Sequence, residues 1–567
     1  MNLKALLALG VLVGVYGFAA FVYLPTGAYW TPDNGIKRIQ AENLRFRPWP
    51  DLSLDYPGQW LDPELKYIPC ALPICYRRGD QVHVAQPAVT AVLARPFLPW
   101  LGDRGGLIIP MLAGLISALW IGHLTQSLGL GPAWAGSLLA GLATPMLFYS
   151  VLWWEHTLAV ALGLGALWFT LQLRDSVRTA FLAGVLAGLA GSARKEMLLF
   201  AVVLWGWLLI QTFSLSPPPR RRWSGLGVWL AGCVAALLPG WWVHVLNSGQ
   251  LIPPEFMVSV VPQFTPEAYL LTHGFNSLAD FLFDPRVAGV GNGLLILLLV
   301  YAASGWIRGA DARGAVRVLA LIGLSMGTLL LLIQRNPGSG LVGVLNVAPF
   351  LMLGLNASAD DRHSVRAVLW ITVTFWALAS LNLGLFTSVG PRQSALEWGA
   401  RFVLIIFPLG APLAVAGLRM IRQQAHTLLT QLHFGAAMGL VVLSVVIQIA
   451  GLNEVRTTVL NRLVSRDAIL AVPEQQVVSG QFWLPMLSPD VFLRKELFFV
   501  PGDDHLAQWA ATAYTQGVRR WAHYRLQPLD QTRADQLAPA GARLTVVETI
   551  PLSDGRFITR LEFVPSP

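Results

Sequence analysis

The segment Thr31-Pro32-Asp33-Asn34-Gly35-Ile36-Lys37 opens a polar stretch that continues to Asp103. This is the longest polar stretch before the C-terminal region, and an apolar run lies on each side of it. An apolar run of about twenty residues is long enough to cross the ~30 Å hydrocarbon core of a bilayer. The pattern therefore predicts a large loop between two membrane spans, with the carboxylate of Asp33 close to the membrane surface.

The composition of the 567 residues indicates a multi-pass membrane protein. Hydrophobic residues make up 54% and charged residues only 13%, and the mean hydropathy is +0.56, whereas a soluble protein carries about a quarter charged residues. The net charge of +9 does not favour nucleic acid as a partner, because the basic residues lie in short clusters between apolar runs. Such clusters are typical of cytoplasmic loops, and membrane lipids are the expected surroundings.

The apolar runs predict thirteen transmembrane helices. The first, within Met1 to Leu24, has one lysine, and the bulky residues Phe21, Tyr23 and Leu24 precede Pro25, so we expect an uncleaved helix rather than a signal peptide. A second large polar loop covers 247–290. The other runs lie at about 105–127, 131–153, 155–173, 178–193, 196–214, 225–246, 290–307, 315–333, 341–356, 367–388, 402–420 and 430–451.

The basic residues predict the orientation of these spans. Alternate connections are rich in arginine, and only the short turn near Gly129 lacks Lys or Arg, so these connections should face the cytoplasm. The N-terminus is then cytoplasmic, and the loops 25–104 and 247–290 face the extracytoplasmic side of the cytoplasmic (inner) membrane. The basic connections contain Arg174 and Arg178; Arg220, Arg221 and Arg222; Arg308, Arg313 and Arg317; Arg362 and Arg366; and Arg419 and Arg422.

The chain changes character at residue 453, where charges become frequent. The sequence predicts a membrane domain, 1–452, followed by a small extracytoplasmic α/β domain, 453–567. Its expected strands lie at 468–473, 544–548 and 557–563, and its expected helices near 503–516 and 528–538. The simplest interpretation of this domain is an appendage that stabilises the fold or docks a partner.

Five segments, taken in order, resemble the GT-C superfamily of integral-membrane glycosyltransferases, which take sugars from polyprenyl-phosphate carriers. An Asp just past the first helix, as at Asp33, opens the first outer loop in that superfamily, although Asn34 departs from the acidic pair often found there. The predicted layout is also similar to that of aminoarabinose transferases and oligosaccharyltransferases. The segments are Thr31 to Asn34, Ala85 to Phe97, Leu182 to Glu196, Asn276 to Asp284 and Gly390 to Arg401.

The resemblance implies a GT-C-like fold and transfer of a sugar from a polyprenyl-phosphate donor to a lipid, glycan or protein acceptor. Such a reaction needs a base for the acceptor and positive charge for the departing phosphate. Asp33 is the candidate base; a solvated or helix-capping carboxylate is the alternative. Direct displacement of the phosphate would invert the anomeric centre.

Further candidates lie at predicted outer helix ends. Glu155 is a second acid or an acceptor contact, and His156 beside it is a substrate contact or an interfacial histidine. Arg194 could grip a phosphate, or form a structural pair with Glu196. Lys37, four residues after Asp33, could meet phosphate or form a surface ion pair. Weaker candidates for phosphate binding are Arg335, Arg392 and Arg401.

The sequence gives no convincing metal site. Cys70 and Cys75 lack nearby partner ligands, and a small disulfide is the alternative. Whether the protein needs a divalent cation stays open, because Asn34 replaces one acid of the pair that would hold it. Other function classes are a secondary transporter or lipid flippase, and a non-catalytic scaffold. Transporters favour midplane charges and repeated halves, but here the charges cluster at outer ends and no halves repeat.

Overall fold

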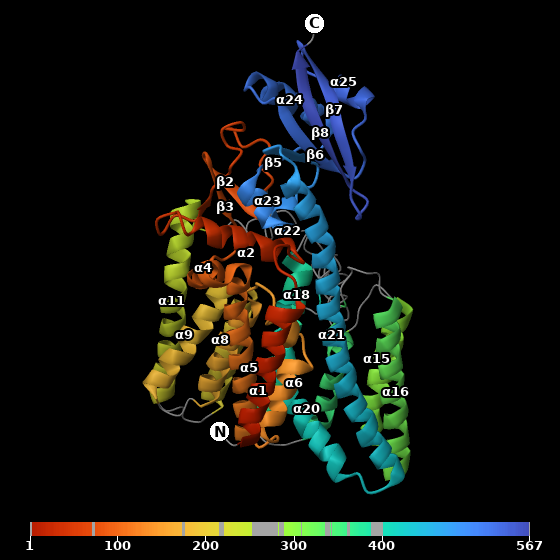
Figure 1. Cartoon of the computed structure of the whole chain (residues 1–567). Helices are drawn as coiled ribbons and strands as arrows, with labels where there is room; N and C mark the ends of the chain where they lie inside the picture. The colour runs from red at the N-terminus through yellow and green to blue at the C-terminus, as the bar shows by residue number, and fades with distance from the viewer. Residues whose placement is uncertain are drawn as a thin grey trace. The chain divides into compact units, whose positions relative to one another are not determined.

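The described residues of the structure, a computed structural model of the whole chain, form two compact units (Figure 1). The first takes its residues from Met1–Val22, Leu107–Trp242 and Ser259–Glu454, and the second from Tyr23–Gly106, Val243–Val258 and Val455–Pro567. The structure describes residues 3–70, 74–172, 176–214, 220–251, 282, 288–307, 309–334, 341, 343–359, 363–386, 398 and 401–565.

The first unit is built from helices. Lipid offers no hydrogen-bond partners to the backbone of an apolar segment, so the backbone groups have to bond to one another. A helix does this within one segment. Two of its helices, α11 and α21, also contribute residues to the second unit. The helices are α1 (Leu3–Phe18), α5 (Ile108–Ser127), α6 (Ala133–Leu142), α7 (Met146–Tyr149), α8 (His156–Leu171), α9 (Val177–Ala193), α10 (Glu196–Phe213), α11 (Arg220–Ser248), α15 (Ala288–Ala303), α16 (Ala310–Gln334), α17 (Val344–Val347), α18 (His363–Phe386), α20 (Ile406–Gln423) and α21 (Leu428–Ala471).

Six helical stretches among the described residues are long and apolar enough to cross a membrane, by length and composition. Five shorter apolar helices, of 10–17 residues, accompany them. The protein is therefore a multi-pass membrane protein, and the count of thirteen spans stays a prediction. The six stretches are Leu3–Tyr23, Val89–Ser127, Glu196–Phe213, Trp223–Ser248, Asp311–Gln334 and Leu428–Ala471.

Helix α9 packs against α11 through small residues. A Cβ added at Gly184 would lie 1.8 Å from the carbonyl oxygen of Trp229, and one at Gly188 would lie 2.3 Å from that of Cys233. Only glycine permits so close an approach of two helix backbones, which is a common device in membrane bundles. The contact fixes α9, whose C-terminal end delivers Arg194.

Several predicted boundaries were wrong. The apolar run at 131–153 is interrupted after α6, and α7 is a single turn. The run at 341–356 contains α17 and a 3-10 helix, Pro349–Ala359, rather than one span. The last run continues as the 44-residue helix α21, so the strand predicted at 468–473 begins as helix.

The second unit contains the first large loop. The helix α2 (Pro32–Asn43) includes the amphipathic run that begins at Gly35. A three-stranded antiparallel sheet of order β1-β3-β2 follows, and then the short helices α3 (Val89–Ala94) and α4 (Leu98–Leu101). Cys70 and Cys75 form a disulfide. The strands are β1 (Ser53–Leu54), β2 (Cys75–Arg78) and β3 (Gln81–Val84).

The C-terminal residues of the second unit form a five-stranded sheet of order β5-β4-β6-β8-β7. Strand β4 runs parallel to β5 and β6. The strands β6, β8 and β7 are antiparallel to their neighbours in the order β6-β8-β7 (Figure 1). The predicted α/β character and both predicted helices are confirmed. The elements are β4 (Gln476–Ser479), α22 (Leu484–Leu487), α23 (Pro489–Arg494), β5 (Glu496–Phe499), α24 (Asp503–Thr515), β6 (Arg520–Arg525), α25 (Gln531–Leu537), β7 (Ala542–Pro551) and β8 (Phe557–Pro565).

One hydrophobic core joins the first loop to the C-terminal sheet. It contains Ile36 and Ile39 from α2 together with Phe498 and Trp509 from the C-terminal part. The apolar face of an amphipathic helix has to be covered, and here residues of the C-terminal part, far away in the sequence, cover it. The predicted boundary at 452/453 falls inside α21, and the compact unit that holds the C-terminal sheet also holds the first loop.

Candidate active site

Asp33 lies in the first turn of α2. The helix begins there because Thr31 has an extended N-cap conformation and Pro32 follows at a position where its missing N–H costs nothing. Thr31, not Asp33, is the N-cap residue, so Asp33 is not the helix-capping carboxylate of the alternative interpretation. The side chain is half-buried, and the positive end of the helix dipole favours its negative charge.

The segment Gln86-Pro87 contacts both predicted residues of α2. Gln86 donates from Nε2 to Oδ1 of Asp33 at 2.6 Å, and Lys37 donates from Nζ to the carbonyl oxygen of Pro87 at 2.6 Å. Lys37 is completely buried, so it does not lie on the surface as the alternative interpretation expected. A buried ammonium is stable only where acceptors replace its water. Gln86 lies in a segment that the sequence singled out, but its contact with Asp33 was not predicted.

The surroundings of Asn34 explain why this chain has an amide, rather than a second acid, directly after Asp33. Its side chain is buried, with 1% of its surface exposed, and its Oδ1 accepts a hydrogen bond of 2.9 Å from the Thr31 hydroxyl. A charged carboxylate at this buried position would cost more than a neutral amide. Asn34 therefore stabilises the turn that leads into α2.

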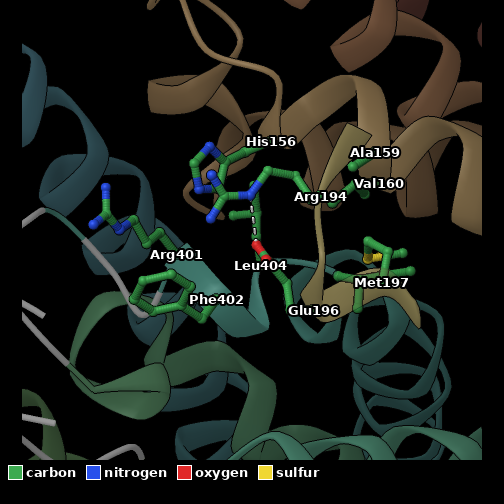
Figure 2. A pocket seen from close by; sticks show the side chains of 10 residues that line it. His156, Ala159, Val160, Arg194, Glu196, Met197, Arg401, Phe402 and Leu404 are labelled. Atoms are coloured by element: carbon green, nitrogen blue, oxygen red, sulfur yellow. Dashed lines mark hydrogen bonds and ion pairs between the residues drawn. The ribbon is translucent and has the colours of Figure 1, made fainter. Parts of the chain in front are cut away.

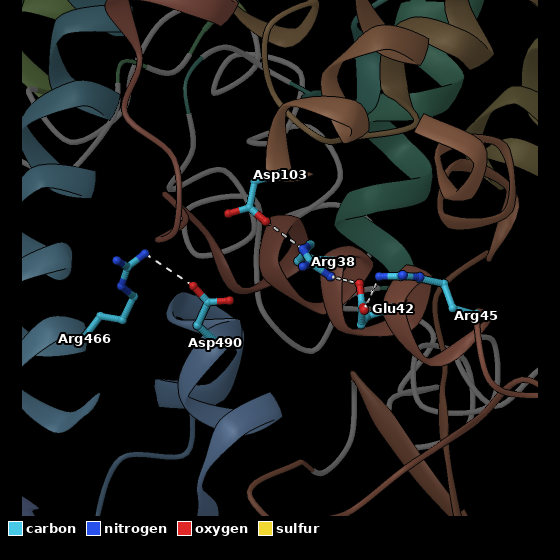
Figure 3. Close-up of polar contacts among 6 residues, drawn as sticks. All are labelled: Arg38, Glu42, Arg45, Asp103, Arg466 and Asp490. Atoms are coloured by element: carbon cyan, nitrogen blue, oxygen red, sulfur yellow. Dashed lines mark hydrogen bonds and ion pairs between the residues drawn. The ribbon is translucent and has the colours of Figure 1, made fainter. Parts of the chain in front are cut away.

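A charged cluster on another face of α2 joins the two ends of the first loop (Figure 3). Arg38 donates from Nε to Asp103 at 2.7 Å and from Nη1 to Glu42 at 2.7 Å. Asp490 lies in the same view and pairs with Arg466 at 3.4 Å. Burial raises the pKa of Asp490, and the nearby Asp103 carboxylate raises it further. None of these residues was predicted from the sequence as part of a site.

The first unit brings together Glu155, Arg194 and Glu196. Arg194 donates from Nη1 to Oε1 of Glu155 at 3.0 Å and from Nε to Oε1 of Glu196 at 2.8 Å. Arg194 has an extended backbone that ends α9, and Glu196 begins α10. Glu155 is fully buried. Burying a charged carboxylate costs free energy, and one charged partner offsets that cost only when the geometry of the pair is good. The structural pair that the sequence offered as an alternative for Arg194 is therefore present.

A small pocket lies beside this ion pair (Figure 2). The guanidinium of Arg401 lies 4.7 Å from the ring centre of Phe402 and 5.3 Å from that of Trp154. His156 packs between aromatic rings, 4.9 Å from Trp154, and is 2% exposed. The polar side chains that line the pocket are His156, Arg194, Glu196 and Arg401.

The predicted residues therefore gather in two places. Glu155, His156, Arg194, Glu196 and Arg401 meet in the first unit, and Asp33 with Lys37 lies in the second. Arg335 and Arg392 lie outside the described residues. Phe402 and Trp154, the aromatic partners of Arg401, were not predicted as site residues. A search of the described ranges finds no group of three or more His, Cys, Asp or Glu side chains arranged to hold a metal ion.

The helical membrane unit and the second unit with its C-terminal sheet together match a fold already known from solved membrane proteins. The fold matches ArnT from Cupriavidus metallidurans bound to undecaprenyl phosphate, with a TM-score of 0.54 and 13% identity over 98% of this chain and 97% of that one. The apo state of ArnT gives a TM-score of 0.52, 12% identity and the same coverage. The likeness at this identity confirms the predicted fold.

Other comparisons are weaker. The oligosaccharyltransferase of Archaeoglobus fulgidus tethered with an acceptor peptide is 10% identical over 91% of this chain and 68% of that one, with a TM-score of 0.46. Neither a family model nor a curated protein matches the sequence.

Proposed function

We propose that the protein is a glycosyltransferase that moves a sugar from a polyprenyl-phosphate carrier to a lipid, glycan or protein acceptor. The reaction takes place on the extracytoplasmic face of the inner membrane, with the N-terminus in the cytoplasm. Support comes from the GT-C fold over nearly the whole chain and from its likeness to a transferase whose structure holds undecaprenyl phosphate. The alternation of arginine-rich connections supports the orientation.

The observation that carries the proposal is the fixed carboxylate of Asp33. One of its oxygens is held by Gln86 at 2.6 Å while the side chain stays half-buried. A general base must be oriented and must remain reachable by the proton it abstracts. Asp33 meets both conditions, and it lies at the position in the first loop where the resemblance places a catalytic acid.

The reaction is an in-line displacement. Asp33 takes the proton of an acceptor hydroxyl or amine, whose heavy atom forms a new bond to the anomeric carbon. The bond between that carbon and the phosphate oxygen breaks, and the oxygen leaves with both electrons as polyprenyl phosphate. The acceptor attacks opposite the leaving group, so the anomeric configuration inverts.

The pocket of the first unit would serve the donor. Arg194 already donates to two carboxylates, so we assign it to orienting Glu155 and Glu196. We assign Arg401 to the phosphate, because guanidinium recognises phosphate well and two aromatic rings hold this one in place. The carboxylates suit sugar hydroxyls as hydrogen-bond acceptors, and His156 lines the same pocket.

A reconstitution experiment tests the proposal. The full-length protein in vesicles of inner-membrane lipids is given a panel of radiolabelled undecaprenyl-phosphate sugars and envelope extract as the source of acceptor. We expect one sugar to leave its carrier, with undecaprenyl phosphate as the second product. Movement of intact label across the bilayer without release would instead place the protein among flippases or transporters.

A further inference from the structure

The chain that enters α2 is held by the C-terminal part of the second unit. We propose that Arg462 of α21 is a positioning residue for Asp33, and that the C-terminal elements thereby form part of the catalytic frame. This inference rests on the proposed role of Asp33 as the base. It assigns function to a region whose simplest sequence interpretation was an appendage.

Arg462 holds the backbone just before the helix. Its Nη1 donates to the carbonyl oxygens of Tyr29 and Trp30. These two carbonyls lie four and three positions before Asp33, in a stretch of the chain that is not helical. A guanidinium bound to two successive carbonyls fixes the direction in which the chain enters α2.

Two further contacts hold the same short segment. The backbone N–H of Tyr29 donates to the carbonyl oxygen of Leu487 in α22 at 2.9 Å. Gly27, with φ +95°, lies against Arg466, and a Cβ there would come within 1.7 Å of its Nη1. A side chain at position 27 would therefore be strained and would also displace Arg466. Residues 27–30 are thus enclosed by α21 and α22.

The first turn of α2 itself rests on α22. A Cβ added to Gly35 would lie 1.5 Å from the carbonyl oxygen of Met486, so the two backbones touch. The next turn buries Ile36 and Ile39 in the core shared with the C-terminal sheet. The backbone on both sides of Asp33 is therefore fixed by C-terminal elements, while Gln86 fixes its carboxylate.

This arrangement predicts an effect on position rather than on charge. Arg462 acts on the backbone and not on the carboxylate, so its loss should let Asp33 move without changing its chemistry. A displacement of about 1 Å at a catalytic group can cost on the order of 10²-fold in rate. Turnover should fall, whereas the KM for the donor should change little.

Steady-state kinetics in vesicles test the inference. Arg462→Gln should lower kcat about 10- to 100-fold, with the donor KM unchanged within about threefold. Arg462→Lys should recover part of the rate, because an ammonium can still donate to one carbonyl. Arg519→Gln is the matched control, since this arginine of the same unit packs over the Tyr514 ring at 5.4 Å. It should retain full activity.

A double variant separates positioning from general loss of structure. If Arg462 acts through Asp33, Asp33→Asn with Arg462→Gln should be no slower than Asp33→Asn alone. Hydrogen exchange over residues 27–36 should rise in Arg462→Gln, whereas exchange in β6 should stay unchanged. The inference would be overturned if the reductions in kcat of the two single variants multiplied in the double variant. It would also be overturned if Arg462→Gln raised the donor KM and increased hydrogen exchange across the whole unit.

Failure of this inference can be told from failure of the proposed function. If Asp33→Asn turns over as fast as the natural protein, the base is misassigned, and with it the positioning role. If Asp33→Asn is inactive while Arg462→Gln is fully active with unchanged exchange over residues 27–36, the positioning role alone is wrong.

Discussion

Asp33 and Glu155 are both acids beside a helix N-terminus, but the protein holds them differently. Asp33 is half-buried and receives a hydrogen bond from the neutral amide of Gln86. Glu155 is fully buried and paired with Arg194, which also binds Glu196. A half-buried carboxylate stays within reach of an acceptor, whereas a fully buried one held by a guanidinium is suited to organising charge. We therefore assign base chemistry to the first region and charge organisation to the second.

The largest expected effect is on turnover at Asp33. Replacing this acid by asparagine removes the proton acceptor and should lower kcat by about 10²- to 10⁴-fold. The melting temperature should stay the same, because an asparagine can still accept the hydrogen bond from Gln86. Turnover of a radiolabelled donor in vesicles and thermal unfolding in detergent measure the two quantities.

Glu155→Gln is the matched comparison for that variant. It preserves shape in the same way, and it should lower turnover by less than about tenfold because it weakens one hydrogen bond rather than removing a base. A Glu155→Gln protein as inactive as Asp33→Asn would erase the distinction between the two acids.

The second effect is on stability at Arg194. Arg194→Gln leaves Glu155 and Glu196 as buried acids without their shared cation, which should cost about 3–5 kcal/mol. Unfolding of the purified protein in a denaturant series measures the loss. The triple variant Glu155→Gln, Arg194→Gln and Glu196→Gln should regain stability, because no buried charge remains uncompensated. An unchanged unfolding midpoint for Arg194→Gln would show that the ion pair is not structural.

The third effect is an acid sensitivity confined to the second unit. Burial lowers the pKa of His523 in β6 to about 3, with a smaller contribution from Arg525. The unfolded chain binds this proton near pH 6.5, so the stabilisation is complete above that pH and is lost as the pH falls toward 3. The slope should approach about 1.4 kcal/mol per pH unit between these limits.

Hydrogen exchange of β6 at pH 7 and pH 5 measures that sensitivity. Exchange should be faster at the lower pH after correction for the intrinsic rate, and His523→Leu should remove the difference. A pH dependence that persists in His523→Leu would assign it to another group.

The smallest effect concerns Gln86. Gln86→Ala removes one hydrogen bond to Asp33, worth about 1–1.5 kcal/mol, so kcat should fall roughly tenfold. Gln86→Glu should be worse, because a second carboxylate would repel the first. Thr90→Ala, a few residues further along the loop, is the control and should keep its activity. Kinetics across this series test whether orientation of Asp33 is limiting.

The sequence was sufficient for the membrane class, the fold and the existence of α2, although the helix begins at Pro32 and so includes Asp33. Runs of apolar residues indicate burial directly, and the helical spacing of apolar residues from Gly35 to Leu44 predicts an amphipathic helix. The sequence was also sufficient for α24 and α25. These features depend on local spacing, which is why they could be read from one sequence.

Other features depend on partners that the sequence does not identify. Strands β4 and β5 have four residues each, too few to show an alternation. Burial of Lys37 depends on Pro87 fifty positions away, and nothing near Arg462 indicates that it reaches back to Tyr29. The helical continuation of α21 through 468–471 overrode the strand propensity of that run, because tertiary context can outweigh weak local preference.

The disulfide between Cys70 and Cys75 gives the chain a built-in reporter of sidedness. All three cysteines are buried in the folded chain, so a thiol reagent should reach the two bridge sulfurs only after the loop has been both loosened and reduced. Disulfides persist in oxidising compartments, and the proposed orientation places this one on the extracytoplasmic side of the membrane. In intact spheroplasts held in a mild denaturant, a reductant that cannot cross lipid should therefore let the first loop accept a maleimide label.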